Sequence, residues 1–412
     1  MTHHELVLFL AQIAVMLCVA LVFGCLARRL GQPAVLGELV GGILLGATVL
    51  GALAPGLYAA LFPAGGGAAV GRSAVVKLGM LFFLFVAGQE VALAQLWGKG
   101  RKVALISVLG MVVPFALGFG LVLLAPGLWG QPPGGRPLVL ALFMGTALSI
   151  SALPVIARIL MDLKLMRTEL GAAVMTAAMF DDLVGWLLFA MILGSVAPGG
   201  PTGGFPWLGC GLVAGAFAVA LTVGRWAAQR ALRWLRPRMP WPSGFIGVAA
   251  VLVLVTAAVF EGAGVHAALG AFLVGVALAP GAAERDEQHE TISQFVTSFF
   301  GAPVYFVSLG LGVSFVTSFD WVLVLVVLAV ACAGKLGGAV LGARLAGIPA
   351  RQALAIGFGM NARGAMGMIL ASVAFENGII DERIFVALIV MALVTSLLSG
   401  PAMQRLSADQ PR

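Results

Sequence analysis

Long apolar runs separated by short polar connections extend along almost the whole chain of 412 residues. A helix needs about 20 largely apolar residues to cross a bilayer, so these runs predict an all-α polytopic membrane protein with thirteen transmembrane spans. The predicted spans are residues 6–26, 34–53, 74–95, 102–125, 137–161, 168–195, 206–232, 244–261, 264–280, 291–316, 320–346, 350–375 and 382–404. The longest connection, around Ala54–Ser73, is rich in glycine and alanine.

The composition agrees with a chain that lies mostly in lipid. Hydrophobic residues make up 61% of the sequence and charged residues 10%, whereas soluble domains average about 45–50% apolar and about 25% charged residues. These values exclude an ordinary soluble protein. We interpret 6–26 as the first span rather than a signal peptide, and we expect no regulatory domain after Pro401 because too few residues follow it.

The formal net charge of +7 indicates membrane topology rather than nucleic-acid binding, since Lys and Arg collect in cytoplasmic loops. With the N-terminus outside, eighteen of the 24 Lys and Arg residues face the cytoplasm and four face outward, while Lys335 and Arg363 lie within spans. This bias predicts an odd number of spans, an external N-terminus and a cytoplasmic C-terminus. We expect a multi-pass protein of a bacterial inner membrane.

Two of the predicted spans contain residues that interrupt a helix. The span 137–161 contains Ser149-Ile150-Ser151-Ala152-Leu153-Pro154, and Pro154 removes a backbone donor and disfavours helix just before it. The span 350–375 contains a glycine-rich polar stretch that includes Asn361 and Arg363. Interrupted spans in corresponding halves are typical of inverted-repeat transporters. We therefore predict two discontinuous helices that cross in the membrane and expose backbone carbonyls there.

The adjacent carboxylates Asp181 and Asp182 lie near the middle of the span 168–195. Placing one charged carboxylate at this depth costs roughly 2.5–3.5 kcal/mol on insertion scales, and intramembrane acids mark functional sites by default. Adjacent helical residues point about 100° apart, so one carboxylate can line a cavity while the other faces a neighbouring helix. The alternative is that hydrogen bonds hold both for packing alone.

Three further kinds of charge need a partner within the membrane. Lys335 lies mid-span among glycines, and one of the two aspartates is its nearest credible partner, although an isolated structural lysine is the alternative. Arg363 stays charged, so it either offsets the negative end of a half-helix or pairs with Glu38 or Glu90; a purely structural role is open. Glu38 and Glu90 lie near span ends, and both are open between structure and function.

Ordered motifs along nearly the whole chain resemble the monovalent cation:proton antiporter family, which includes the Kef-type potassium exchangers and bacterial sodium/proton antiporters. Each motif alone is weak, but their order is specific. They are Gly31–Glu38 with Gly42–Gly46, Leu84–Glu90, Ala147–Leu160, Asp181–Asp182, Gly264–Phe272, Pro303–Phe306, Lys335 and Asn361–Met366.

The resemblance implies a homodimer whose protomers combine a core domain with a dimerisation domain and move by elevator-like alternating access. The core helices would be roughly 74–195 and 320–404, and the dimerisation helices roughly 1–53 and 206–316. Asp182 matches the principal ion- and proton-binding aspartate, and Asp181 matches the carboxylate that pairs with the core lysine, here Lys335. Family members with an Asp-Asp pair are read as electrogenic sodium/proton exchangers.

The sequence therefore predicts a secondary antiporter that exchanges a monovalent cation, sodium above potassium or lithium, for protons. We expect Asp182, aided by Asp181 and by the hydroxyl of Ser149 or Ser151, to bind the cation and expel protons. If Lys335 also releases a proton, two protons move per cation, and no cofactor is needed. No nucleophile–base set or metal-spaced His/Cys cluster occurs in the sequence, which disfavours an enzyme.

We expect the chain to depart from the family pattern in three respects: Ala365 replaces an acid, Gln89 replaces an apolar residue, and the nucleotide-binding domain of the Kef branch is absent. A potassium/proton exchanger of Kef type without that domain is the leading alternative function. An ion channel and a non-transporting sensor are the alternatives from other classes.

Overall fold

A computed structural model describes residues 1–89, 100–130, 136–163, 165–166, 168–196, 211, 214–215, 217–235, 238, 243–262, 266–279, 301–311 and 313–407. These residues form helices joined by turns and loops, and none of them lies in a β-strand. The chain divides into two compact units. Unit 1 contains Met1–Gln89, Ala220–Gly262 and Ala267–Phe319, and unit 2 contains the remaining segments.

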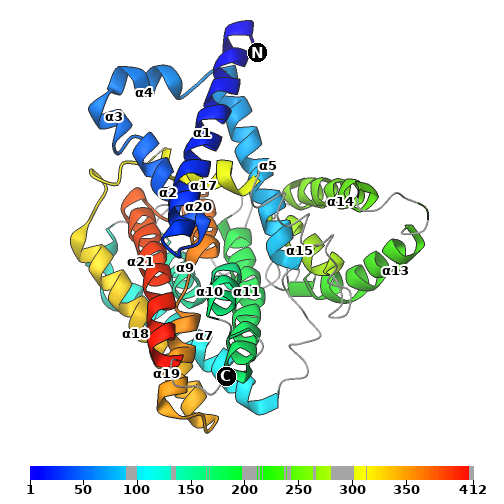
Figure 1. Ribbon diagram of the computed structural model, residues 1–412, viewed down its shortest axis with the longest axis vertical. Helices are drawn as coiled ribbons and strands as arrows, with labels where there is room; N and C mark the ends of the chain where they lie inside the picture. The colour runs from blue at the N-terminus through cyan, green and yellow to red at the C-terminus, as the bar shows by residue number, and fades with distance from the viewer. Residues whose placement is uncertain are drawn as a thin grey trace. The chain divides into compact units, whose positions relative to one another are not determined.

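Unit 1 is built from long apolar helices and a few short ones (Figure 1). They are α1 (His3–Arg29), α2 (Ala34–Leu45), α3 (Leu50–Leu53), α4 (Pro55–Leu61), α5 (Gly67–Gln89), the π-helical turn η2 (Ala220–Gly224), α13 (Arg225–Leu235), α14 (Ser243–Gly262), α15 (Ala267–Leu278) and α17 (Gly301–Leu311). Glycines let the backbones approach closely, as is typical of membrane helices. A side chain at Gly37 would collide with the Phe23 carbonyl in α1, and one at Gly42 with the Val307 carbonyl in α17.

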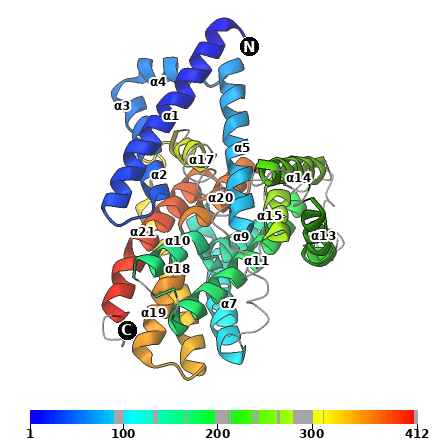
Figure 2. The ribbon, with the colours of Figure 1, turned by 45° about the vertical axis from the view of Figure 1, so that its right-hand side comes forward.

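Unit 2 contains both aspartates and both interrupted spans. Its helices are α7 (Gly100–Leu124), α8 (Pro126–Trp129), α9 (Pro137–Ser149), α10 (Leu153–Asp162), α11 (Glu169–Val196), α18 (Trp321–Leu345), α19 (Ala350–Met360), α20 (Gly364–Glu376) and α21 (Glu382–Ser407). Both views of the ribbon show α18 beside α21, and α7 packs against α9, α11 and α18 (Figures 1 and 2).

The predicted all-helical membrane fold is confirmed. Among the described residues, eight helices are long and apolar enough to cross a membrane, or nine when α19 and α20, bent by 43°, form one broken span. The shorter apolar helices α9 and α15 lie within the predicted spans 137–161 and 264–280. Parts of 206–232 and 291–316 lie outside the described residues, so the number thirteen stays a prediction.

The predicted span 34–53 coincides with a candidate span at Ala34–Leu53. Within it, α2 ends before Gly46 and the chain turns before α3 begins at Leu50. The helix α5 belongs to unit 1, whereas the sequence-based partition put 74–95 with the core helices. Close backbone packing of Gly88 against Phe272 in α15 holds α5 in unit 1. The dimerisation role of the other helices stays a prediction.

Candidate functional site

The two aspartates lie in the middle of α11, and both side chains are fully buried, with 0% exposure. Apolar residues flank the pair on both sides, which explains why hydropathy predicts an uninterrupted span here. The helix continues through the pair without a break. The two carboxylates therefore point in different directions and meet different surroundings.

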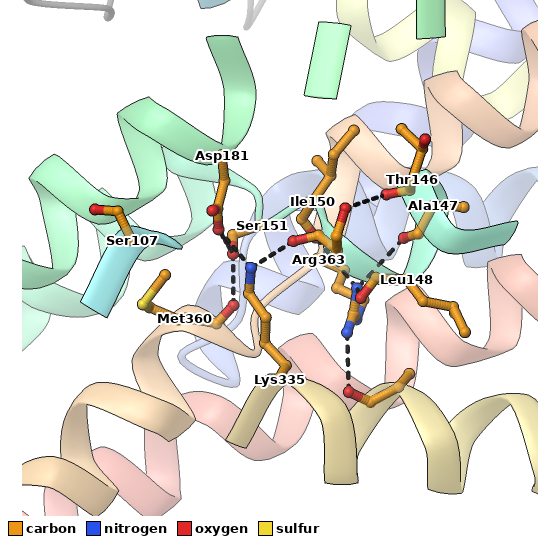
Figure 3. Close-up of polar contacts among 12 residues, drawn as sticks. Ser107, Thr146, Ala147, Leu148, Ile150, Ser151, Asp181, Lys335, Met360 and Arg363 are labelled. Carbon is orange, nitrogen blue, oxygen red and sulfur yellow. Dashed lines mark hydrogen bonds and ion pairs between the residues drawn. The ribbon is translucent and has the colours of Figure 1, made fainter. Parts of the chain in front are cut away.

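Asp181 is the partnered member of the pair. Its Oδ2 forms an ion pair with Nζ of Lys335 from α18 and accepts a hydrogen bond of 2.7 Å from the Ser151 hydroxyl. Lys335 is also fully buried and donates a second hydrogen bond to the Ser149 carbonyl at the end of α9. Figure 3 shows the lysine reaching toward Asp181 and Ser151. The resemblance-based pairing of Asp181 with Lys335 is therefore present in the structure.

Asp182 contrasts with its neighbour, because neither of its carboxylate oxygens has a hydrogen-bond partner among the described residues. The Oδ1 atoms of Asp181 and Asn361 are likewise buried without such a partner. Buried polar atoms normally have partners, so each exception calls for an explanation. Carboxylate and amide oxygens are the ligands that hard cations prefer, and a carboxylate oxygen also binds a proton.

The two interrupted spans meet at their breaks. The first break lies between Ser149 and Leu153, with Pro154 as the second residue of α10, and the second lies between Met360 and Gly364. The backbone N–H of Ala152 donates to the carbonyl of Ala362 over 2.7 Å. The prediction that two discontinuous helices meet is thereby confirmed.

Ser151 links the second break to the ion pair. Its hydroxyl lies 2.7 Å from the Met360 carbonyl, which ends α19, and 2.7 Å from Oδ2 of Asp181 (Figure 3). One hydroxyl proton can be donated to only one of these acceptors at a time. The Ser149 hydroxyl instead donates to Thr146 within its own helix, over 2.8 Å. Of the two serines predicted to aid binding, only Ser151 directs its hydroxyl at the acidic pair.

Arg363 lies at the second break and is fully buried. Its Nη1 donates to the carbonyls of Ala147 (3.3 Å), Leu148 (2.5 Å) and Ile150 (3.2 Å), and its Nη2 donates to Ala331 in α18 over 3.0 Å (Figure 3). These carbonyls at the end of α9 carry partial negative charge. The arginine thus contacts a half-helix end, as expected for one of the three roles left open for it, and its role stays a prediction. Within unit 2, no described carboxylate forms an ion pair with it.

Of the two remaining candidate acids, the structure describes only Glu38. Glu38 lies in α2 of unit 1, buried against Gly24 of α1, and its Oε2 has no hydrogen-bond partner among the described residues. Glu90 lies outside the described residues. Residue types alone do not reveal the backbone carbonyls that bind Lys335 and Arg363. The helix interruptions predict only that exposed carbonyls are present.

The fold and the buried cluster beside two interrupted helices are typical of a membrane transporter, and comparison gives the family. The transmembrane sodium/hydrogen exchanger family matches residues 15–408, and the chain belongs to it. It is 31% identical to the Na(+)/H(+) antiporter NhaS4 of Synechocystis, covering 97% of both chains. It is 33% identical to Cation/H(+) antiporter 18 of Arabidopsis thaliana over 96% of this chain and 48% of that protein.

The chain thus spans about half the length of its Arabidopsis relatives. Names of further relatives include both sodium and potassium antiporters. The fold is similar to that of the sodium proton antiporter MjNhaP1 from Methanocaldococcus jannaschii, with a TM-score of 0.71, 14% identity and coverage of 98% and 99% of the two chains. This likeness supports the fold.

Proposed function

We propose that the protein is a secondary antiporter that exchanges a monovalent cation for protons across the membrane by alternating access. Asp182 carries the cation in one state and a proton in the other. Asp181, held by Lys335 and Ser151, completes the site. Sodium is the favoured cation, and potassium/proton exchange is the alternative, because the relatives' names include both ions.

The unpartnered carboxylate of Asp182 carries this proposal. Asp181 already has a lysine and a hydroxyl as partners, whereas both oxygens of Asp182 are buried without one. An ionised carboxylate at membrane depth is costly, and a proton or a bound cation removes its net charge. Asp182 therefore requires a proton or a cation to neutralise its charge, whereas Lys335 already neutralises Asp181.

Competition for one negative charge is sufficient to couple the two fluxes. If the site changes its exposure only when Asp182 is neutralised, each half-cycle carries either a cation or a proton. A second proton follows if Asp181 leaves Lys335 to join the cation, because the buried lysine then loses its counter-charge and releases a proton. Under this scheme two protons move per cation, and exchange carries net charge.

Everted vesicles that contain the full chain provide the test. Respiration acidifies the vesicle lumen, a pH-sensitive dye is quenched, and added NaCl, LiCl or KCl reverses the quenching if the cation exchanges for protons. We expect dequenching with sodium at the lowest concentration, and none with Asp182→Asn. The control Glu376→Gln, an exposed acid in α20, retains activity. Normal exchange by Asp182→Asn would reject the site.

Two finer parts of the proposal need their own measurements. In proteoliposomes, an imposed membrane potential should change the rate of exchange, and a rate that ignores the potential would reject two-proton stoichiometry. Crosslinking in native membranes tests the proposed homodimer. Reporter fusions at both termini test the proposed external N-terminus and cytoplasmic C-terminus.

A further inference from the structure

A basic and aromatic segment in unit 1 has no part in the proposed exchange. From Arg225 to Trp241 the sequence contains five arginines and three tryptophans. No acidic residue occurs between Arg225 and Glu261. The structure places the first part of this segment in α13. The apolar membrane-crossing helix α14 follows within a few residues, and its apolar stretch starts at Gly244. The basic segment therefore adjoins the end of a membrane-spanning helix.

The residue spacing gathers arginines and tryptophans on one side of α13. Trp226, Arg230, Arg233 and Trp234 occupy positions i, i+4, i+7 and i+8, the spacing that brings side chains to one face of a helix. The tryptophans are 61% and 59% exposed, and both arginines are exposed. We name these four residues the Arg–Trp face. Arg225 anchors the helix differently, by donating to the Val276 carbonyl in α15 over 3.2 Å.

The positive charges of this face lack acidic partners within the described residues. Arg233 donates only to the Gln229 carbonyl of its own helix (3.4 Å), and neither it nor Arg230 forms an ion pair there. Arg238 extends the face, because its guanidinium lies 4.2 Å from the ring centre of Trp234 and donates to that residue's carbonyl over 2.6 Å. Within the part of the chain that the structure describes, no acidic side chain receives the donors of this face.

We propose that the Arg–Trp face binds the phosphate headgroup of an anionic phospholipid. Guanidinium groups recognise phosphate oxygens through paired hydrogen bonds. Tryptophan prefers the boundary between headgroups and acyl chains, and basic clusters on amphipathic helices beside membrane-spanning helices recognise anionic lipids. The exposed tryptophans and the adjoining span favour a lipid over a soluble anion. The lipid would hold α13 against the bilayer surface.

Native mass spectrometry of the purified full chain tests this binding. The protein is titrated with phosphatidylglycerol or phosphatidylcholine of identical acyl chains, and the affinity of the first bound lipid is compared. We expect tighter binding of phosphatidylglycerol, and a loss of about tenfold or more in Arg230→Gln/Arg233→Gln, since each arginine near a membrane surface contributes about 1 kcal/mol. Arg230→Lys/Arg233→Lys keeps both charges but not the paired hydrogen bonds, so it should lose less affinity than the glutamine variant, which separates lost charge from lost folding.

The control removes two positive charges elsewhere. Arg28 and Arg29 are exposed at the end of α1, and Arg28→Gln/Arg29→Gln should leave the affinity for the first bound phosphatidylglycerol unchanged. Equal losses in both double variants would overturn the proposal in favour of diffuse attraction. So would equal affinity for the two lipids, or displacement of phosphatidylglycerol by soluble glycerol phosphate. These outcomes do not depend on transport, so they are independent of the proposed exchange.

Discussion

The backbone N–H of Ala152 donates to the carbonyl of Ala362 over 2.7 Å, although 210 positions separate the two residues in the sequence. Each residue lies in the break of an interrupted helix, where backbone groups have lost their helical partners. In lipid such groups must be satisfied by protein or water. Each break therefore helps to satisfy the other, and the crossing places Ser151 and Arg363 beside the buried ion pair.

The crossing should be sensitive to a single methyl group at Gly364. This glycine begins α20 with φ +39°, in the region that disfavours side chains, and a Cβ there would collide with Val155 of α10. We expect Gly364→Ala to lower the free energy of unfolding by about 1–3 kcal/mol and to reduce exchange. Thermal unfolding in detergent measures the first effect.

Gly367 offers a matched control one turn later in α20. A Cβ at that position would meet only Arg363 Cβ at 3.7 Å and Ala392 Cβ at 3.9 Å, which are ordinary contacts. We expect Gly367→Ala to unfold like the wild type. Equal destabilisation by the two substitutions would contradict the close contact assigned to Gly364.

The two serines of the first break should differ in their effect on cation binding. Ser151→Ala removes a hydroxyl that contacts the Asp181 carboxylate, and hydrogen bonds to charged groups contribute about 1.5–3 kcal/mol. We therefore expect the apparent KM for the cation to rise by roughly tenfold or more. Ser149→Ala removes only a bond within α9 and should change KM little. Dequenching across a range of cation concentrations measures both, and a larger effect of Ser149→Ala would contradict the geometry.

Asp181 and Lys335 should depend on each other for stability. Removing one partner leaves the other charge buried alone, and breaking a buried pair costs about 3–5 kcal/mol. Lys335→Met and Asp181→Asn should each lower the thermal unfolding temperature, while the double variant should lose much less than the sum of the two. Additive losses in this double-mutant cycle would show that the pair is not energetically coupled.

Arg363 should not tolerate replacement by lysine. Its guanidinium donates to two carbonyls in α9, one in the break that follows it and one in α18, a pattern that one ammonium group on a flexible stem cannot reproduce. We expect Arg363→Lys to destabilise the protein by about 2 kcal/mol or more. The control Arg383→Lys alters a partly exposed pair with Asp320 (3.3 Å) and should cost under about 1 kcal/mol. Similar unfolding temperatures for the two variants would contradict the role assigned to Arg363.

Hydropathy and helix-breaking residues predict much of the fold. Apolar runs locate α1, α7, α11, α18 and α21 to within a few residues, because lipid requires long uninterrupted helices. Pro154 and the glycines before Asn361 predict both interruptions. Hydropathy does not predict the end of α2, because the apolar run continues through Gly46, where the backbone becomes extended.

The details of the site were less predictable. The charges of Asp181, Asp182 and Lys335 stand out against apolar sequence, so residue types alone identify the candidates. The choice between Ser149 and Ser151 depends on side-chain direction at a non-helical break, which sequence spacing does not determine. The partners of Arg363 are backbone carbonyls, and every residue has one, so no residue type marks them.

The central claim, that Asp182 carries both the proton and the cation, is tested most directly by counting ions on the purified protein. Sodium is added to the full chain in weakly buffered detergent solution, and bound sodium and released protons are measured together. The wild type should release at least one proton per sodium bound, and Asp182→Asn should neither bind sodium nor release protons. Sodium binding by the wild type without proton release, or undiminished proton release by Asp182→Asn, would contradict the account.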